Sequence, residues 1–218
     1  AAAAQRLVAI APDDPDYMME MGWGAQNLGV VQLNGFADPA AAQRSFETAT
    51  RWFARAAATR PADGVIRREQ ANAYGWLADS FYLRELWRPS LAARLQQYRI
   101  TERLYLDDPD NVETAYRLAI AERSVARLSA LVGNRAAARP FLARAYRRSQ
   151  ALTLRDPRNS EWLIFKAKVE CDILHPAFRP SATGLDIERS VISIHSILMA
   201  QRDPRSAELR ECVERINS

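Results

Sequence analysis

The chain has 218 residues, 48% of them hydrophobic, and its 30 basic and 26 acidic residues give a formal net charge of +4. This composition excludes a disordered tail and is sufficient for a substantial core. No apolar run approaches the roughly 20 residues that a membrane-spanning helix needs, so we expect no insertion into a membrane. Nearly all the basic residues are arginine, with lysine only at Lys166 and Lys168, which is more typical of genomic composition than of a selected binding patch. Charge alone therefore argues only weakly for nucleic acid as a partner.

The two ends and the cysteines give further expectations. The chain opens on four alanines instead of methionine, and we expect it to be a piece of a longer protein. Residues 5–15 are typical of the end of a helix. Cys171 and Cys212 are too few for a disulfide framework and are distant in sequence, so we expect buried free thiols.

Short breaks that contain proline recur along the chain. Their prolines are Pro15 (or Pro12), Pro61, Pro109, Pro157 and Pro204, which are 46 (or 49), 48, 48 and 47 residues apart. Such regular spacing indicates an internal repeat. The sequence therefore predicts one array of units over 12–60, 61–108, 109–156 and 157–203, with a terminal helix over 204–218.

Each unit is predicted to hold two antiparallel helices of about 20 residues, as in 112–133 and 135–154, because apolar residues recur every three or four positions. A proline ends one helix, and a neighbouring Asp, Asn or Ser can cap the next. The acid pairs Asp13-Asp14 and Asp107-Asp108 are therefore expected in caps and solvated turns. In the fourth unit a longer loop, 175–186, precedes an apolar helix over 187–200, which could join two copies of the chain.

Aligned by their breaks, the first helices share a large residue followed by an apolar or small one. These pairs are Leu28-Gly29, Leu77-Ala78, Val125-Ala126 and Ile173-Leu174, and the second helices share the small residues Ala42, Ser90 and Ala138. With the turn "GNRAAARPFLARA" and the closing proline, this pattern resembles the tetratricopeptide repeat family, whose unit has 34 residues. The longer unit of this chain adds about two helical turns to each helix, which keeps the buried face in register.

The resemblance implies an all-α fold, a right-handed superhelical solenoid of stacked antiparallel helix pairs in which the first helices line a concave surface. Long units of this kind are similar to arrays appended to bacterial signalling proteins. The resemblance implies a non-catalytic protein-interaction or sensor module that holds a peptide or protein partner. Partner-binding residues are expected on the first helices: Trp23, Gln26, Asn72, Asp79, Tyr82, Arg123, Arg127 and Lys168.

Two other functions stay open. One is a regulatory domain of a larger bacterial signalling protein that senses a small molecule, with a pocket in the fourth unit. The other is an RNA-binding helical repeat. The latter would use Arg67, Arg68, Arg144, Arg147 and Arg148 with the aromatic side chains of Tyr98 and Tyr146.

No catalytic or phosphate-binding motif occurs in the sequence, so we expect neither an enzyme nor a cofactor. Cys171 and His175 share a helical face, and His195 or Cys212 could join them around a metal. A structural zinc site usually has tighter ligand pairs, so we expect no metal. The tryptophans are expected to anchor stacked helices. We expect a cytoplasmic protein, with the periplasmic part of a membrane-anchored signalling protein as the alternative.

Overall fold

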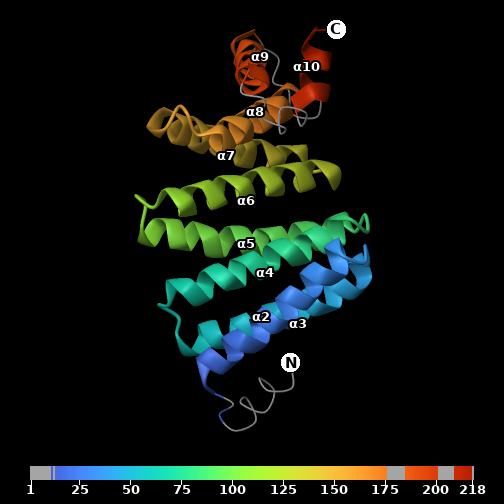
Figure 1. The fold of residues 1–218 in the computed structure, drawn as a ribbon, viewed down its shortest axis with the longest axis vertical. Coiled ribbons are helices and arrows are strands. Elements are labelled where there is room, and N and C mark those ends of the chain that lie inside the picture. Colours follow the sequence, from blue (N-terminus) through green and yellow to red (C-terminus); the bar gives the residue numbers. More distant parts are fainter. Residues whose placement is uncertain (1–10, 12, 176–184, 201–208, 218) are drawn as a thin grey trace. The chain divides into compact units, whose positions relative to one another are not determined.

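The fold is built from helices. A computed structural model describes residues 11, 13–175, 185–200 and 209–217 (Figure 1). Within these ranges all regular structure is helical, which confirms the predicted all-α class. The helices are α2 (Pro15–Asn34), α3 (Pro39–Thr59), α4 (Gly64–Tyr82), α5 (Trp87–Asp107), α6 (Val112–Leu131), α7 (Arg135–Arg155), α8 (Ser160–Leu174), α9 (Leu185–Ala200) and α10 (Arg210–Asn217).

The chain forms two compact units, unit 1 from Ala1 to Pro109 and unit 2 from Asp110 to Ser218. None of the helices in the described ranges is long and apolar enough to span a bilayer. Most of the break over 201–209, the loop over 175–186 and the helix end over 5–15 lie outside the described residues. The right-handed superhelix stays a prediction.

The breaks end and begin helices in the way their residues predict. The side chains of Asp14, Asp38 and Asp63 each accept hydrogen bonds from backbone N–H groups in the first turn of the next helix. Asn111, Asn134 and Asn159 do the same in unit 2. These caps satisfy donors that the helix itself leaves unpaired.

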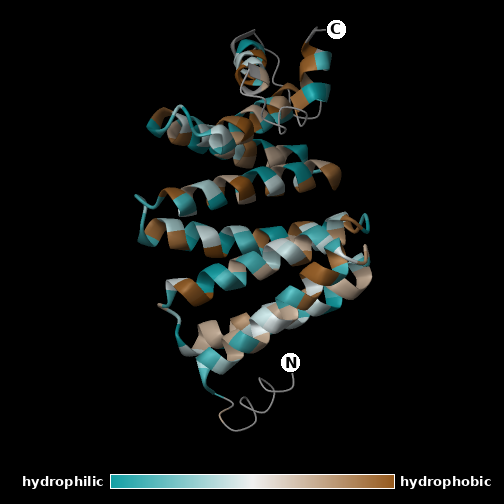
Figure 2. Cartoon of the chain, viewed as in Figure 1, coloured by the Kyte–Doolittle hydropathy of each residue, from teal (hydrophilic) through white to brown (hydrophobic). Residues whose placement is uncertain are grey.

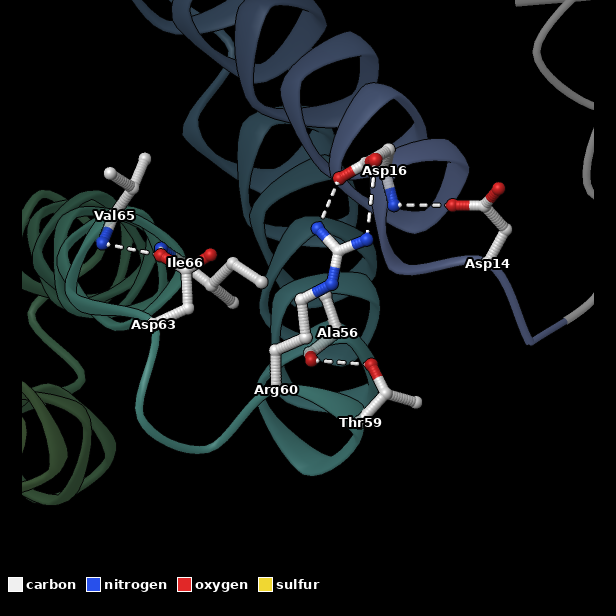
Figure 3. A network of polar contacts seen from close by, with 8 residues as sticks. All are labelled: Asp14, Asp16, Ala56, Thr59, Arg60, Asp63, Val65 and Ile66. Carbon is white, nitrogen blue, oxygen red and sulfur yellow. Dashed lines mark hydrogen bonds and ion pairs between the residues drawn. The ribbon is translucent and has the colours of Figure 1, made fainter.

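Figure 3 shows the break between α3 and α4 beside the start of α2. The guanidinium of Arg60 donates to both carboxylate oxygens of Asp16, at 2.6 and 3.3 Å. Asp63 accepts from the backbone N–H groups of Val65 and Ile66. The break therefore caps the start of α4 through Asp63 and ties the end of α3 to the start of α2 through Arg60, whose partner Asp16 is 44 residues away in sequence.

Asp107 has a different role from the expected one. It ends α5, and its carboxylate accepts a hydrogen bond from Arg67 of α4 at 2.7 Å and lies 3.3 Å from Arg103. The expectation of a cap or a solvated turn was wrong for this residue. Asp107 pairs with Arg103, one turn earlier on α5, and with Arg67 of α4, so it links the two helices of one repeat.

In unit 1, α3 packs against both α2 and α4, and α4 packs against α5. Two glycines of α2 allow an unusually close approach to α3. A Cβ atom at Gly22 would lie 2.4 Å from the ring of Phe53, and one at Gly29 would lie 2.6 Å from the ring of Phe46. Both rings are fully buried, so the aromatic side chains of α3 fill the space that the missing methyl groups leave.

In unit 2 each helix packs against the next one along the chain, from α6 to α10. Small residues of α7, among them Ala138 and Ala145, meet Phe165 and Val169 of α8 in one core cluster. A second cluster joins Ile164 of α8 with α9 and with Leu209 at the start of α10. Figure 2 shows the corresponding mixture of apolar and polar residues along each helix.

The cysteines correct another expectation. Cys171 of α8 and Cys212 of α10 form a disulfide, and their Cα atoms are 5.9 Å apart. The expectation of free thiols was therefore wrong. In a repeat of about 48 residues, two residues that are 41 positions apart in sequence can lie close together in space. The same bond removes Cys171 and Cys212 from any metal site with His175 or His195.

Candidate partner-binding face

The residues predicted to bind a partner define what we call the first-helix face. They are Trp23, Gln26, Asn72, Asp79 and Tyr82 in unit 1 and Arg123, Arg127 and Lys168 in unit 2. Within each unit the first helices touch, α2 against α4 and α6 against α8. A face that runs across neighbouring first helices is therefore present within each unit.

In unit 1, the aromatic residue of α2 is fixed by a carboxylate of α4. The indole N–H of Trp23 donates to Glu69 Oε2 at 3.3 Å, and the ring is half-buried against the core cluster of Met18 and Phe53. Because the indole is both packed and bonded, its orientation is set before any partner arrives. Trp23 is therefore a half-buried anchor within the fold.

The amides of unit 1 are also half-buried. The carbonyl Oε1 of Gln26 is fully buried and accepts no hydrogen bond within the described part of the chain. An unsatisfied buried acceptor is uncommon and costs about 1–3 kcal/mol. Asn72 on α4 has an interaction partner within the chain.

The end of α4 carries the remaining predicted residues of unit 1. Asp79 forms an ion pair with Arg94 of α5, which also donates to Gln97 at 2.7 Å. Tyr82 is 39% exposed and meets Trp87 edge to face, with ring centroids 5.1 Å apart. The α4–α5 turn thus presents an aromatic pair beside the exposed side chains of Leu83 and Leu86.

In unit 2, the first-helix face carries a charged cluster. Arg123 of α6 donates to Asp172 Oδ2 of α8 at 2.6 Å, and both side chains are mostly buried. Arg127, one turn further along α6, lies 4.0 Å from the other oxygen of Asp172 and is 47% exposed. Two guanidinium groups share one carboxylate, so the cluster retains one positive charge. Lys168 is half-buried and has a partner within the chain.

Two fully buried glutamates lie 48 residues apart in unit 2. Glu122 of α6 accepts from Arg144 and Arg148 of α7, at 3.2 and 3.0 Å. Burial raises the pKa of Glu122, and the two arginines oppose that rise by stabilising the charged form. The sequence did not single out Glu122, and its spacing of 48 residues from Glu170 was the signal that could have identified it.

The second glutamate is neutralised differently. Lys166, one turn before Glu170 on α8, lies 2.7 Å from Glu170 Oε1 and donates to Ser190 Oγ of α9 at 2.6 Å. Charge holds this pair, since neither oxygen of Glu170 accepts a well-aligned hydrogen bond within the described residues. Burial raises the pKa of Glu170 as well.

The residues that RNA binding would use are partly engaged in contacts within the fold and partly exposed. Arg67 pairs with Asp107, and Arg144 and Arg148 pair with the buried Glu122, whereas Arg68 and Arg147 are exposed. The hydroxyl of Tyr98, a buried residue, donates a hydrogen bond to Glu102.

The apolar helix of the fourth unit, α9, is buried on one part of its surface and exposed on another. Val191 and Ile194 are buried, and Ile197 and Met199 are exposed.

No protein-family model matches the chain, and no curated protein matches it. Among solved structures, the chain is similar to a de novo designed helical repeat protein. The sequence identity is 16%, the match covers 94% of this chain and 93% of that chain, and the TM-score is 0.42. A similarity of this degree carries no argument about family or function.

Proposed function

We propose that the chain is a non-catalytic protein-interaction module, a long variant of the tetratricopeptide repeat that holds a peptide or protein partner on its first-helix face. The observation that carries this proposal is the cluster of Arg123, Asp172 and Arg127. Asp172 orients Arg123, and the exposed Arg127 keeps donors that Asp172 does not reach within hydrogen-bonding distance.

A guanidinium in this position suits a carboxylate of the partner. Arginine binds carboxylates through two parallel hydrogen bonds, which give orientation as well as affinity. Because Arg123 and Asp172 are mostly buried, they hold the face in one arrangement before binding, and the partner does not have to order it. The partner is therefore expected to carry an acidic group where it crosses α6.

The test is a capture experiment with the wild-type chain and two single variants. Arg127→Gln removes the exposed charge of the cluster and leaves the Arg123–Asp172 pair in place. Arg117→Gln is the matched control, because Arg117 is also on α6 and its side chain is 41% exposed. The proposal requires a protein that both wild type and the control retain and that Arg127→Gln loses. Three identical sets of captured proteins would refute it.

We also propose that the protein works in an oxidising compartment, which favours the periplasmic alternative over the cytoplasm. The support is the Cys171–Cys212 disulfide, since such bonds persist in the periplasm and are rare in the cytosol. Alkylation of the denatured, unreduced natural protein should label neither cysteine. Complete labelling of both cysteines would contradict this compartment. We also propose that the chain is part of a bacterial signalling protein, as its resemblance to the long repeat arrays of such proteins implies.

A further inference from the structure

The positive charge of the chain is concentrated in one helix. Residues 135–155, which form α7, contain six arginines and no acidic residue. Subtracting these six charges from the net charge of +4 leaves −2 for the rest of the chain. A general bias of the sequence toward arginine does not explain this distribution, because elsewhere acidic residues outnumber the basic ones.

The arginines of α7 point in different directions. Arg144 and Arg148 turn inward to the buried Glu122, and Arg155 donates to a backbone carbonyl at 3.4 Å. Arg135, Arg139 and Arg147 are exposed and form no ion pair with the residues that the structure describes. Arg135 also occupies the first turn, where a positive charge opposes the helix dipole at a cost of about 0.3–1 kcal/mol. These three side chains do not stabilise the fold in any way that the contacts show.

Exposed apolar residues of α7 belong to one row along the helix, which we call the seam. Its apolar members are Ala136, Pro140, Ala143 and Leu154, which are all exposed, and Leu154 is 81% exposed. Arg147 and the half-buried Gln150 complete the row, whose positions follow alternating steps of four and three residues. This is the spacing with which one helix packs along another in a coiled coil, and charged residues beside such a seam select the partner.

We propose that the outer face of α7 binds an acidic amphipathic helix of a partner protein. The small residues of the seam allow the partner helix to approach closely, and its apolar side covers Leu154. Its glutamates or aspartates pair with Arg135, Arg139 and Arg147. This surface belongs to a second helix of the repeat, so the proposal goes beyond the first-helix face.

A protein helix fits this face better than a single-stranded nucleic acid does. Nucleic acid would use aromatic platforms among the arginines. The aromatic residues of α7, Phe141 and Tyr146, instead pack against the core cluster of unit 2, and Phe141 lies under the guanidinium of Arg144. The exposed uncharged residues of the face are all aliphatic, which suits the apolar ridge of a helix.

The probe is a synthetic alanine-rich peptide of about three heptads with leucines on one edge and glutamates on both flanks. A second peptide has glutamine at every glutamate position. Binding to the full chain is measured by fluorescence anisotropy at low and high salt. We expect the glutamate peptide to bind, the glutamine peptide to bind at least about tenfold more weakly, and the difference to shrink at high salt.

Three variants locate the binding. Arg135→Glu/Arg139→Glu/Arg147→Glu should abolish it, and Leu154→Ala should weaken it without a change of charge. The matched control, Arg44→Glu/Arg51→Glu/Arg99→Glu, makes the same change of charge at exposed arginines of α3 and α5 and should bind as wild type does. Circular dichroism verifies that all three variants remain helical.

The proposal fails if the acidic peptide does not bind, or if the α7 and control variants lose binding equally. It also fails if a 20-nucleotide single-stranded RNA binds more tightly than the peptide and depends on the same arginines. Arg127→Gln should leave binding of the acidic peptide unchanged, because Arg127 is on α6. A loss of partner capture in that variant, with peptide binding intact, separates this proposal from the one for the first-helix face.

Discussion

Two glycines of α2 should respond in opposite directions to the same substitution. Gly22 faces Phe53, and a new Cβ there would lie 2.4 Å from a ring that is fully buried. Gly24, two residues further along, is exposed, and nothing lies within 4 Å of its Cβ position. Both residues are inside the same helix, so they share the same gain in helix propensity when alanine replaces them.

The magnitudes follow from these contacts. Alanine is more favourable than glycine in a helix interior by about 1 kcal/mol, so Gly24→Ala should raise the free energy of unfolding by up to that amount. An extra methyl group in a packed core costs about 1–3 kcal/mol, so Gly22→Ala should leave the chain unchanged at best and otherwise destabilise it by up to about 2 kcal/mol. The two variants should therefore differ by about 1–3 kcal/mol.

Equilibrium unfolding in urea, followed by far-ultraviolet circular dichroism, measures both variants against wild type. Adding Phe53→Leu to Gly22→Ala should cost less than the sum of the two single changes, because the smaller side chain relieves the clash. If Gly22→Ala stabilises the chain as much as Gly24→Ala, α2 does not lie as close to α3 as the structure indicates. Additive effects of the two core changes would lead to the same conclusion.

Three further predictions concern single interactions. Burial raises the folded-state pKa of Glu122, so the folded chain holds this proton more tightly, and its contribution to stability falls as pH rises from the ordinary glutamate range through the raised value. Urea unfolding at a series of pH values should show a smaller fall for Glu122→Gln, and an unchanged slope would contradict the burial. Replacing Cys171 and Cys212 with serine should lower the free energy of unfolding of unit 2 by up to about 4 kcal/mol, as the chain-entropy model gives for a loop of this length, and should make unfolding insensitive to reductant. Asn111→Ala should cost about 1 kcal/mol through loss of the cap on Thr114, whereas Asn111→Asp should cost much less; equal losses would show that the cap is not the cause.

The helices and their ends were predictable because their signals are local. A proline, a capping Asp or Asn and an apolar residue every three or four positions all act within a few residues of one another. The predicted first helix over 112–133 and the observed α6, Val112–Leu131, differ only at the end, where Gly133 adopts a positive φ of 87°. The capping role of Asp14 and Asp63 follows from the same local chemistry.

The links between helices were not predicted, although the repeat contains the information. Trp23 and Glu69 are 46 residues apart, and Arg123 and Asp172 are 49 apart. These separations are close to one repeat of about 48 residues. A residue on one first helix therefore meets a residue about one period away on the next, and the distance in sequence reports the repeat length.

The disulfide follows the same rule. Its separation of 41 residues argued against pairing only while the cysteines were considered without the repeat. In a chain of stacked helix pairs, α8 and α10 are the first helix of one unit and the helix that follows that unit. Residues of these two helices are brought together by the stacking, so a separation near one period favours contact.

Ion pairs within and between repeats also determine which side chains are left for a partner. Arg123 pairs with Asp172 of the next repeat, whereas Asp79 pairs with Arg94, and the inner arginines of α7 pair with Glu122, within one repeat. From the residue types alone, all the predicted residues of the first-helix face were equivalent candidates for binding a partner. The contacts leave Arg127 as the exposed charge of that face in unit 2. They also leave the outer arginines of α7 as a second surface, which neither the repeat nor the core requires. Under the proposed function, binding specificity depends on the charges that remain after each helix has been paired with its neighbours.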